Sequence, residues 1–151
     1  MTKTLVQRLA GFLNLGRLPA EIRTRLESEG GITYLAEGVA QTAMLTDFRA
    51  PGIRCAYRRI SAVGCLAMSP RSLVLRGQAY HQVNVDLSFE DPGLSRMHFA
   101  LKVRHLAVRF DAQGLIPEAS GGVELRLGLP DAPEAARLLR QAGVEVRTEG
   151  A

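Results

Sequence analysis

Apolar and polar residues alternate through the middle of the chain, between residues 31 and 129. The clearest segment is 81–90, where every second residue is apolar. Successive side chains of a strand point to opposite faces, so this period predicts a strand with one buried face. The same argument predicts strands over 72–76, 97–104, 105–111 and 123–129. Less regular strands are predicted over 32–45 and 53–68, with a loop over 46–52 between them.

Two glycines interrupt the less regular strands. Gly38 and Gly64 each stand inside a β-prone stretch. A glycine within a strand marks a bulge, a sharp bend or a close approach of another backbone. We therefore expect the two long strands to bend at these positions.

The spacing of apolar residues changes to a helical period at both ends of the chain. Near the N-terminus it predicts a first helix with one apolar face, made of Leu5, Leu9, Phe12 and Leu13. A second helix is predicted over 19–29, beginning at Pro19 and ending at Gly30 and Gly31. Ile22 and Leu26 lie on one side of that second helix.

The C-terminal helix is predicted over 131–142. Asp131 is its expected N-cap, and Glu134 would complete a capping box. Its apolar positions are Ala135, Leu138, Leu139 and Ala142. Residues 144–148 are expected to form either an extension of this helix or a brief edge strand.

The predicted element order is two helices, about seven antiparallel strands and a final helix. Runs of strands without helices between them exclude a parallel α/β sheet. The fold class is therefore mainly β (α+β), a barrel of antiparallel strands capped by the C-terminal helix. We divide the chain into an N-terminal helical appendage, residues 1–30, and a β-barrel domain, residues 31–151.

Two segments resemble the pleckstrin-homology (PH) superfold, including its GRAM-like and bacterial members. Residues 64–75, GCLAMSPRSLVL, are similar to a hairpin of that family, and residues 122–129 followed by 131–141 are similar to its last strand and capping helix. The resemblance implies two near-orthogonal antiparallel sheets capped by a helix, over residues 31–142. Phosphoinositide-binding members carry a basic-x-Arg pair on the second strand. Arg54 is followed by Cys55 and Ala56, so that pair is missing.

Length and composition are those of one soluble domain. The chain has 151 residues, of which 46% are hydrophobic and 23% charged, and no apolar run reaches the 18–20 residues of a membrane span. Arg8 interrupts the apolar N-terminal stretch and no A-x-A cleavage site follows, so we expect no signal peptide and a cytoplasmic location. Cys55 and Cys65 lie in apolar surroundings, which favours two buried thiols.

Basic residues are concentrated in one stretch of the chain. The net charge is +4, yet no acidic residue occurs between Asp47 and Asp86. Uncompensated like charge attracts anions. The candidate anion-binding residues within this stretch are Arg49, Arg54, Arg58 and Arg59. The alternative interpretation places these arginines on several strands, each paired with an acid from elsewhere.

The chain shows no pattern typical of a catalytic or cofactor site. His81, His98 and His105 lack metal-ligand spacing, and we expect His98 and His105 to face solvent. The turn around Asp86, Glu90 and Asp91 is interpreted as a solvated connection rather than an acid–base pair. Serine elbows and phosphate-binding glycine loops are absent from the sequence. We therefore expect no cofactor, no metal and no enzymatic activity.

The resulting hypothesis is a PH-like binding module that contacts a protein partner or a second copy of itself. Contact would use an exposed strand edge, or the basic loop for an anionic lipid surface. Specific nucleic-acid readout is not expected, because the chain has no Trp and Tyr57 is the one aromatic residue between Arg49 and Tyr80.

Two alternative functions stay open. Arg54-x-x-x-Arg58 followed by Asp86-x-Ser88 resembles the two halves of the PilZ cyclic-di-GMP site, although Asp91 stands where that motif requires glycine. The other alternative is carriage of a small apolar ligand in a cavity of the barrel. That cavity would be lined by Phe89, Phe99, Phe110 and leucines.

Overall fold

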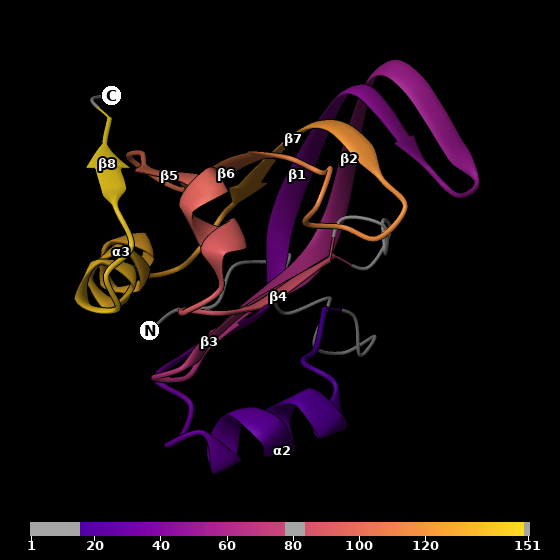
Figure 1. Ribbon diagram of the computed structural model, residues 1–151. Coiled ribbons are helices and arrows are strands. Elements are labelled where there is room, and N and C mark those ends of the chain that lie inside the picture. Colours follow the sequence, from indigo (N-terminus) through magenta and orange to yellow (C-terminus); the bar gives the residue numbers. More distant parts are fainter. Residues whose placement is uncertain (1–15, 78–83, 150–151) are drawn as a thin grey trace.

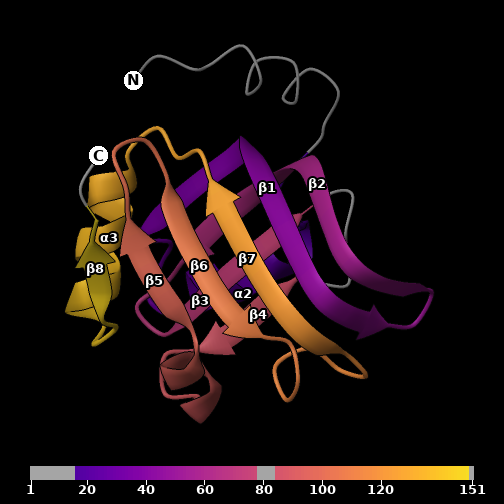
Figure 2. The same ribbon diagram turned by 90° about the horizontal axis from the view of Figure 1, so that it is seen from above.

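A computed structural model describes residues 16–77 and 84–149. Within these ranges eight strands form one curled sheet, a half-barrel, in the order β4-β3-β2-β1-β7-β6-β5-β8 (Figures 1 and 2). The elements are α2 (Ala20–Ser28), β1 (Tyr34–Ala50), β2 (Ile53–Met68), β3 (Ser72–Gly77), β4 (Val85–Ser88), a 3-10 helix η2 (Pro92–Arg96), β5 (His98–Leu101), β6 (Leu106–Asp111), β7 (Ser120–Leu127), α3 (Ala132–Gln141) and β8 (Val146–Thr148). The predicted mainly β class is confirmed.

The strand count and the closure of the sheet differ from the prediction of about seven antiparallel strands in a barrel. The described sheet has an eighth strand, β8, which pairs in parallel with β5. Of the two structures expected for residues 144–148, the edge strand is therefore the one that forms. The sheet is an open half-barrel with β4 and β8 at its two edges.

Strands β1 and β2 form a long hairpin, and the prediction of a loop over 46–52 is wrong. β1 continues to Ala50, which pairs with Ile53, so the connection is only Pro51 and Gly52. Gly52 has φ +82°, the conformation that glycine supplies at the third position of a type II turn behind proline. The sequence predicts a longer loop because Thr46–Arg49 lack clean alternation and are followed, after Ala50, by the turn residues Pro51 and Gly52.

The two strand glycines have different roles. At Gly38 the β1–β2 register shifts between Ala36 and Val39, and φ is +64°, which confirms the expected bulge. Gly64 stays in register, opposite Val39. A Cβ at Gly64 would lie against the carbonyl oxygen of Arg76, so here glycine permits a close approach of β3.

The concave face of the sheet holds the main core, and α3 packs onto it. Ala132, Ala135, Ala136 and Leu139 of α3 are buried in the same cluster as the inward residues of the strands. The helix lies within the predicted limits 131–142. The prediction of a capping box is wrong: Asp131 makes no side-chain cap hydrogen bond, and Glu134 pairs with Arg137, one turn ahead.

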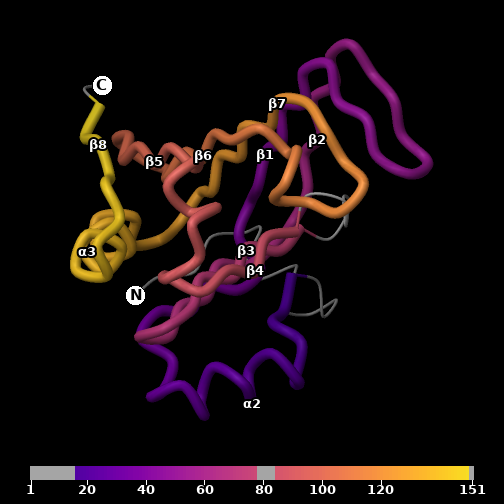
Figure 3. Tube along the Cα trace, viewed as in Figure 1, coloured from indigo at the N-terminus to yellow at the C-terminus, as the bar shows by residue number. Residues whose placement is uncertain are grey.

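Helix α2 covers the opposite face of the sheet, beside β2 and β3. Leu26 is fully buried there with Cys65, Ala67 and Val74. Figures 1 and 3 show α2 under β3 and β4, away from α3. The second predicted helix is thus confirmed, with its apolar side on the sheet. The first predicted helix, including Leu5 and Phe12, lies outside the described residues.

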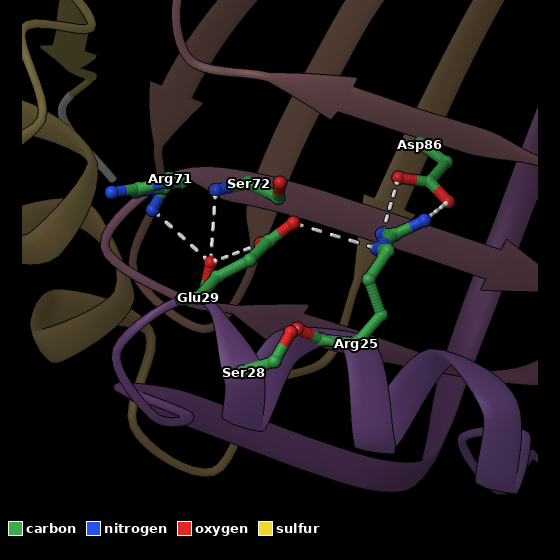
Figure 4. A network of polar contacts seen from close by, with 7 residues as sticks. Arg25, Ser28, Glu29, Arg71, Ser72 and Asp86 are labelled. Carbon is green, nitrogen blue, oxygen red and sulfur yellow. Dashed lines mark hydrogen bonds and ion pairs between the residues drawn. The ribbon is translucent and has the colours of Figure 1, made fainter.

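Polar contacts fasten α2 to the sheet at two points (Figure 4). The Arg25 guanidinium donates two hydrogen bonds of 2.7 Å to the Asp86 carboxylate on β4. These bonds raise the pKa of Arg25. At the end of the helix, the Ser69 hydroxyl donates to Glu29 at 2.8 Å and accepts from the backbone N–H of Ser72. The two points hold the helix along the strands.

Candidate functional site

The four candidate arginines all lie on the β1–β2 hairpin, near its tip. Arg49 is on β1, and Arg54, Arg58 and Arg59 are on β2; all four are exposed. Figures 1 and 3 show this hairpin extending beyond the rest of the sheet, away from both helices. The structure therefore brings the four residues onto one projecting element.

The arginines lie on both faces of that element. Ile53, Cys55 and Ile60 all pack against the main core, so the inward positions change from odd to even numbers between residues 55 and 60. Arg54 lies between two inward residues and Arg59 beside another, which puts both on the outer face. Arg58, next to Arg59, points to the other face.

Arg49 belongs with the outer arginines. It stands directly opposite Arg54 in the hairpin register, between the buried Phe48 and the core-packed Ala50. Side chains opposite each other in an antiparallel pair share a face, with Cβ atoms about 5 Å apart. The outer face thus carries Arg49, Arg54 and Arg59, with Arg54 and Arg59 separated by about 17 Å along the strand.

None of these four side chains has an ion-pair partner among residues 16–77 and 84–149. The expectation that each pairs with an acid from another strand is therefore not met in the described part of the chain. The acid-free stretch does not form one patch, however. Arg71 lies in the β2–β3 turn and Arg76 on β3, next to the body of the sheet.

Among residues 16–77 and 84–149, the tip half of β2 has a strand on one side only. β3 pairs with Gly64–Met68 only. From Ile53 to Val63, β2 is bonded to β1, and no other strand of the described residues lies along it. Unpaired N–H and C=O groups of such an edge are a template for a further strand. Tyr57, 63% exposed, lies midway along this edge.

Sequence reasoning identifies the arginines but misses how far the free edge extends. Because a loop is expected over 46–52, the predicted first strand ends at residue 45 and leaves the tip of the β1–β2 hairpin out. The sequence signal is the run Ala56-Tyr57-Arg58-Arg59, in which apolar and charged residues do not alternate, and the structure exposes all four residues. A strand that packs one face on the body of the protein alternates apolar and polar residues, so this run indicates a segment that projects from the body.

Two hollows lie elsewhere on the described part of the molecule. A groove of about 500 Å³ beside β5 and β8 is lined by apolar residues such as Phe89 and Phe99 and by charged ones such as Arg109 and Glu149. A smaller cleft of about 330 Å³ lies between Leu138 of α3 and Pro70. Phe110, expected in a ligand cavity, is packed in the main core instead.

The remaining candidates for chemistry do not converge. His98 is exposed, as expected, while His105 is half-buried, and burial lowers its pKa. Within residues 16–77 and 84–149, no group of three His, Cys, Asp or Glu side chains could hold a metal ion. Asp86 is exposed, as expected for a solvated segment, and it also binds Arg25. His81 lies outside the described residues.

The two halves of the PilZ-like motif lie far apart. Asp86 pairs with Val74, and Val74 with Ala67. Ala67 is nine residues along β2 from Arg58, a distance of about 30 Å. Asp86 is moreover engaged by Arg25. The arginines and the Asp86 segment therefore do not line a common pocket.

Both cysteines are free, and both are on β2. Cys65 is buried under α2, and this burial raises the pKa of its thiol to about 11. Cys55, near the hairpin tip, is half-buried. The expectation of two buried thiols is right for Cys65 and only partly so for Cys55.

No protein-family model matches the chain, and no curated protein matches its sequence. In the part of the chain that the structure describes, no helix is long and apolar enough to cross a membrane.

Proposed function

We propose that the chain is a non-enzymatic, PH-like binding module that binds a protein partner by adding a strand to its sheet. The observation that carries the proposal is the free edge of β2 from Ile53 to Val63. An extended peptide that joins such an edge gains main-chain hydrogen bonds, and the alternating side chains add specificity.

The curled sheet supports the PH-like part of the proposal. Its antiparallel strands bend around one core, and α3 packs against that core through Ala135 and Leu139. This arrangement agrees with the bent antiparallel strands and capping helix that the sequence resemblance implies.

The hairpin is held in one conformation, with the edge of β2 exposed. Phe48, which is fully buried, and Cys55, which contacts the core, fix its inner face. Its tip is closed by a two-residue turn, which leaves little freedom for the strands to separate. A pre-formed edge lowers the ordering cost of a partner strand.

The test is a titration of the full ¹⁵N-labelled chain with nine-residue strand-forming peptides in acidic, neutral and basic versions. We expect at least one version to shift the amide resonances of residues 53–63 and to slow their hydrogen exchange. Amides of β6, which is paired on both sides, serve as the internal control. The proposal is wrong if none of the peptides affects 53–63, or if the shifts fall elsewhere.

A further inference from the structure

We infer that the strand added to β2 is an extended acidic segment of another protein. This inference rests on the proposed strand-edge function and specifies the chemistry of the partner. It is carried by Arg54, Arg58 and Arg59, which lie along the free edge, are exposed and have no ion-pair partner in the described ranges.

A strand beside β2 would place its side chains next to these arginines. Neighbouring strands lie about 4.8 Å apart, and side chains directly opposite have Cβ atoms about 5 Å apart. Glutamate or aspartate at such positions meets a guanidinium within hydrogen-bond reach. Arginine presents a planar fork that binds a carboxylate through two parallel hydrogen bonds.

The spacing suits an extended chain better than a compact anion. Arg54 and Arg59 are about 17 Å apart along the outer face. Arg58 points to the other face, so a flat lipid surface on one side of the hairpin meets only part of the set. Carboxylates several residues apart on one extended peptide, projecting to both faces, match this arrangement.

The same charges act against a second copy of the chain. Pairing two β2 edges would bring three arginines from each copy into one ribbon, with no acidic residue between Asp47 and Asp86 to offset them. Like charges across neighbouring strands are destabilising, and charged side chains are a known protection of strand edges against self-pairing. Repulsion between the arginines therefore disfavours pairing of two β2 edges, whereas a strand that carries carboxylates is attracted.

The experiment measures affinity by calorimetry for three peptides of alternating Val and Thr in which three positions are Glu, Gln or Lys. We expect the Glu peptide to bind at least tenfold more tightly than the Gln peptide, and the Lys peptide not to bind. The preference should weaken as salt rises from 50 to 500 mM, because exposed charges are screened. The Glu peptide with every residue N-methylated keeps its charge but has no N–H donor on either edge, and it should bind at least tenfold more weakly.

Substitutions of the arginines test whether these side chains cause the preference for the Glu peptide. In the full chain, Arg54→Glu with Arg59→Glu should reverse the preference, so that the Lys peptide binds and the Glu peptide does not. Arg104→Glu, at an exposed arginine of the β5–β6 turn, is the matched control and should retain the original order. Thermal melts of both variants check that they fold. Reversal by folded protein cannot arise from general damage to the hairpin.

The outcomes separate the two proposals. Equal binding of the Glu and Gln peptides at residues 53–63 overturns the acidic partner and leaves strand addition standing. Equal binding of the N-methylated peptide overturns strand addition itself. Retention on phosphatidylglycerol vesicles that requires Arg54 and Arg59, without peptide binding, would assign the arginines to a lipid surface. A concentration-dependent dimer that joins β2 edges would assign them to a second copy.

Discussion

The two halves of β2 differ in burial and in strand pairing. From Gly64 to Met68 every residue is buried, between the main core on one face and α2 on the other. From Arg54 to Arg59 five of the six residues are exposed, and among the described residues the strand has a neighbour on one side only. One continuous strand thus passes from a fully buried segment to an exposed edge.

The difference separates the half of β2 that stabilises the fold from the half for which we propose a binding role. The buried half is apolar in sequence, Gly64-Cys65-Leu66-Ala67-Met68, and contributes stability by removing apolar surface from water. The other half carries three arginines and Tyr57, and the side chains that it packs against the core, such as Ile53 and Ile60, are only partly buried. Its regular pairing with β1 keeps it extended, and this order is what a partner strand needs.

The largest expected contrast is in the reactivity of the two cysteines. At pH 8 a thiol with a pKa of about 11 is thiolate in only about one molecule in a thousand, and the thiolate is the reactive form. Burial also blocks access of the reagent to Cys65. We expect iodoacetamide to modify Cys55 at least a hundredfold faster than Cys65, as followed by peptide mass spectrometry. Comparable rates in native protein would contradict the packing of α2 over β2.

The raised pKa of Cys65 also has a consequence for stability at alkaline pH. The folded pKa lies above the unfolded value, so the native state holds its proton more tightly. This contribution is present in full below about pH 8.5 and is lost as pH rises toward about 11. Urea unfolding should show the stability falling over that interval, and Cys65→Ala should make the fall shallower.

Truncation of a core side chain gives the second largest effect. Leu66 is fully buried in the main cluster, and Leu66→Ala should lower the free energy of unfolding by about 3 kcal/mol. Tyr57→Ala, nine residues earlier on the same strand, should change it by less than about 0.5 kcal/mol. Urea denaturation of both variants checks the contrast. Similar losses at the two sites would mean that the hairpin tip is covered in solution.

Periodicity predicts most of the buried half and the strands around it. Leu106, Val108 and Phe110 alternate as expected, and α3 and α2 lie where their apolar spacing places them. The apolar pattern predicts these elements correctly because one face of each lies on the core along its whole length. It fails at Val103, expected inward but 68% exposed, because β5 ends at Leu101 and the chain turns before reaching it.

The candidate site is harder to predict than the fold. The arginines are identified from the charge pattern, which depends only on the sequence. Their division between two faces depends on the change of inward positions between Cys55 and Ile60, which a strict two-residue period cannot show. The pairing of Arg25 with Asp86 joins residues 61 positions apart, and no local pattern encodes such a contact.

Gly64 marks the boundary between the halves and gives a smaller effect. A Cβ there would clash with the Arg76 carbonyl oxygen, so Gly64→Ala must displace β3 and should cost about 2 kcal/mol. Gly122→Ala is the matched control, because its Cβ would meet Thr46 at an ordinary 3.6 Å. We expect that control to be neutral or slightly stabilising. Thermal unfolding of the two variants decides whether β3 approaches β2 as closely as described.

The smallest expected effect concerns the free half alone. Arg49 and Arg54 stand opposite each other, and like charges at such a pair are destabilising. Arg49→Glu replaces repulsion with attraction and should stabilise the protein by about 0.5 kcal/mol at low salt. Arg49→Gln, which only removes the repulsion, should give a smaller gain, and both gains should shrink in 1 M NaCl because exposed charges are then screened. Urea unfolding at the two salt concentrations measures them. A gain in stability that persists in 1 M NaCl would not be electrostatic. It would contradict the placement of Arg49 opposite Arg54.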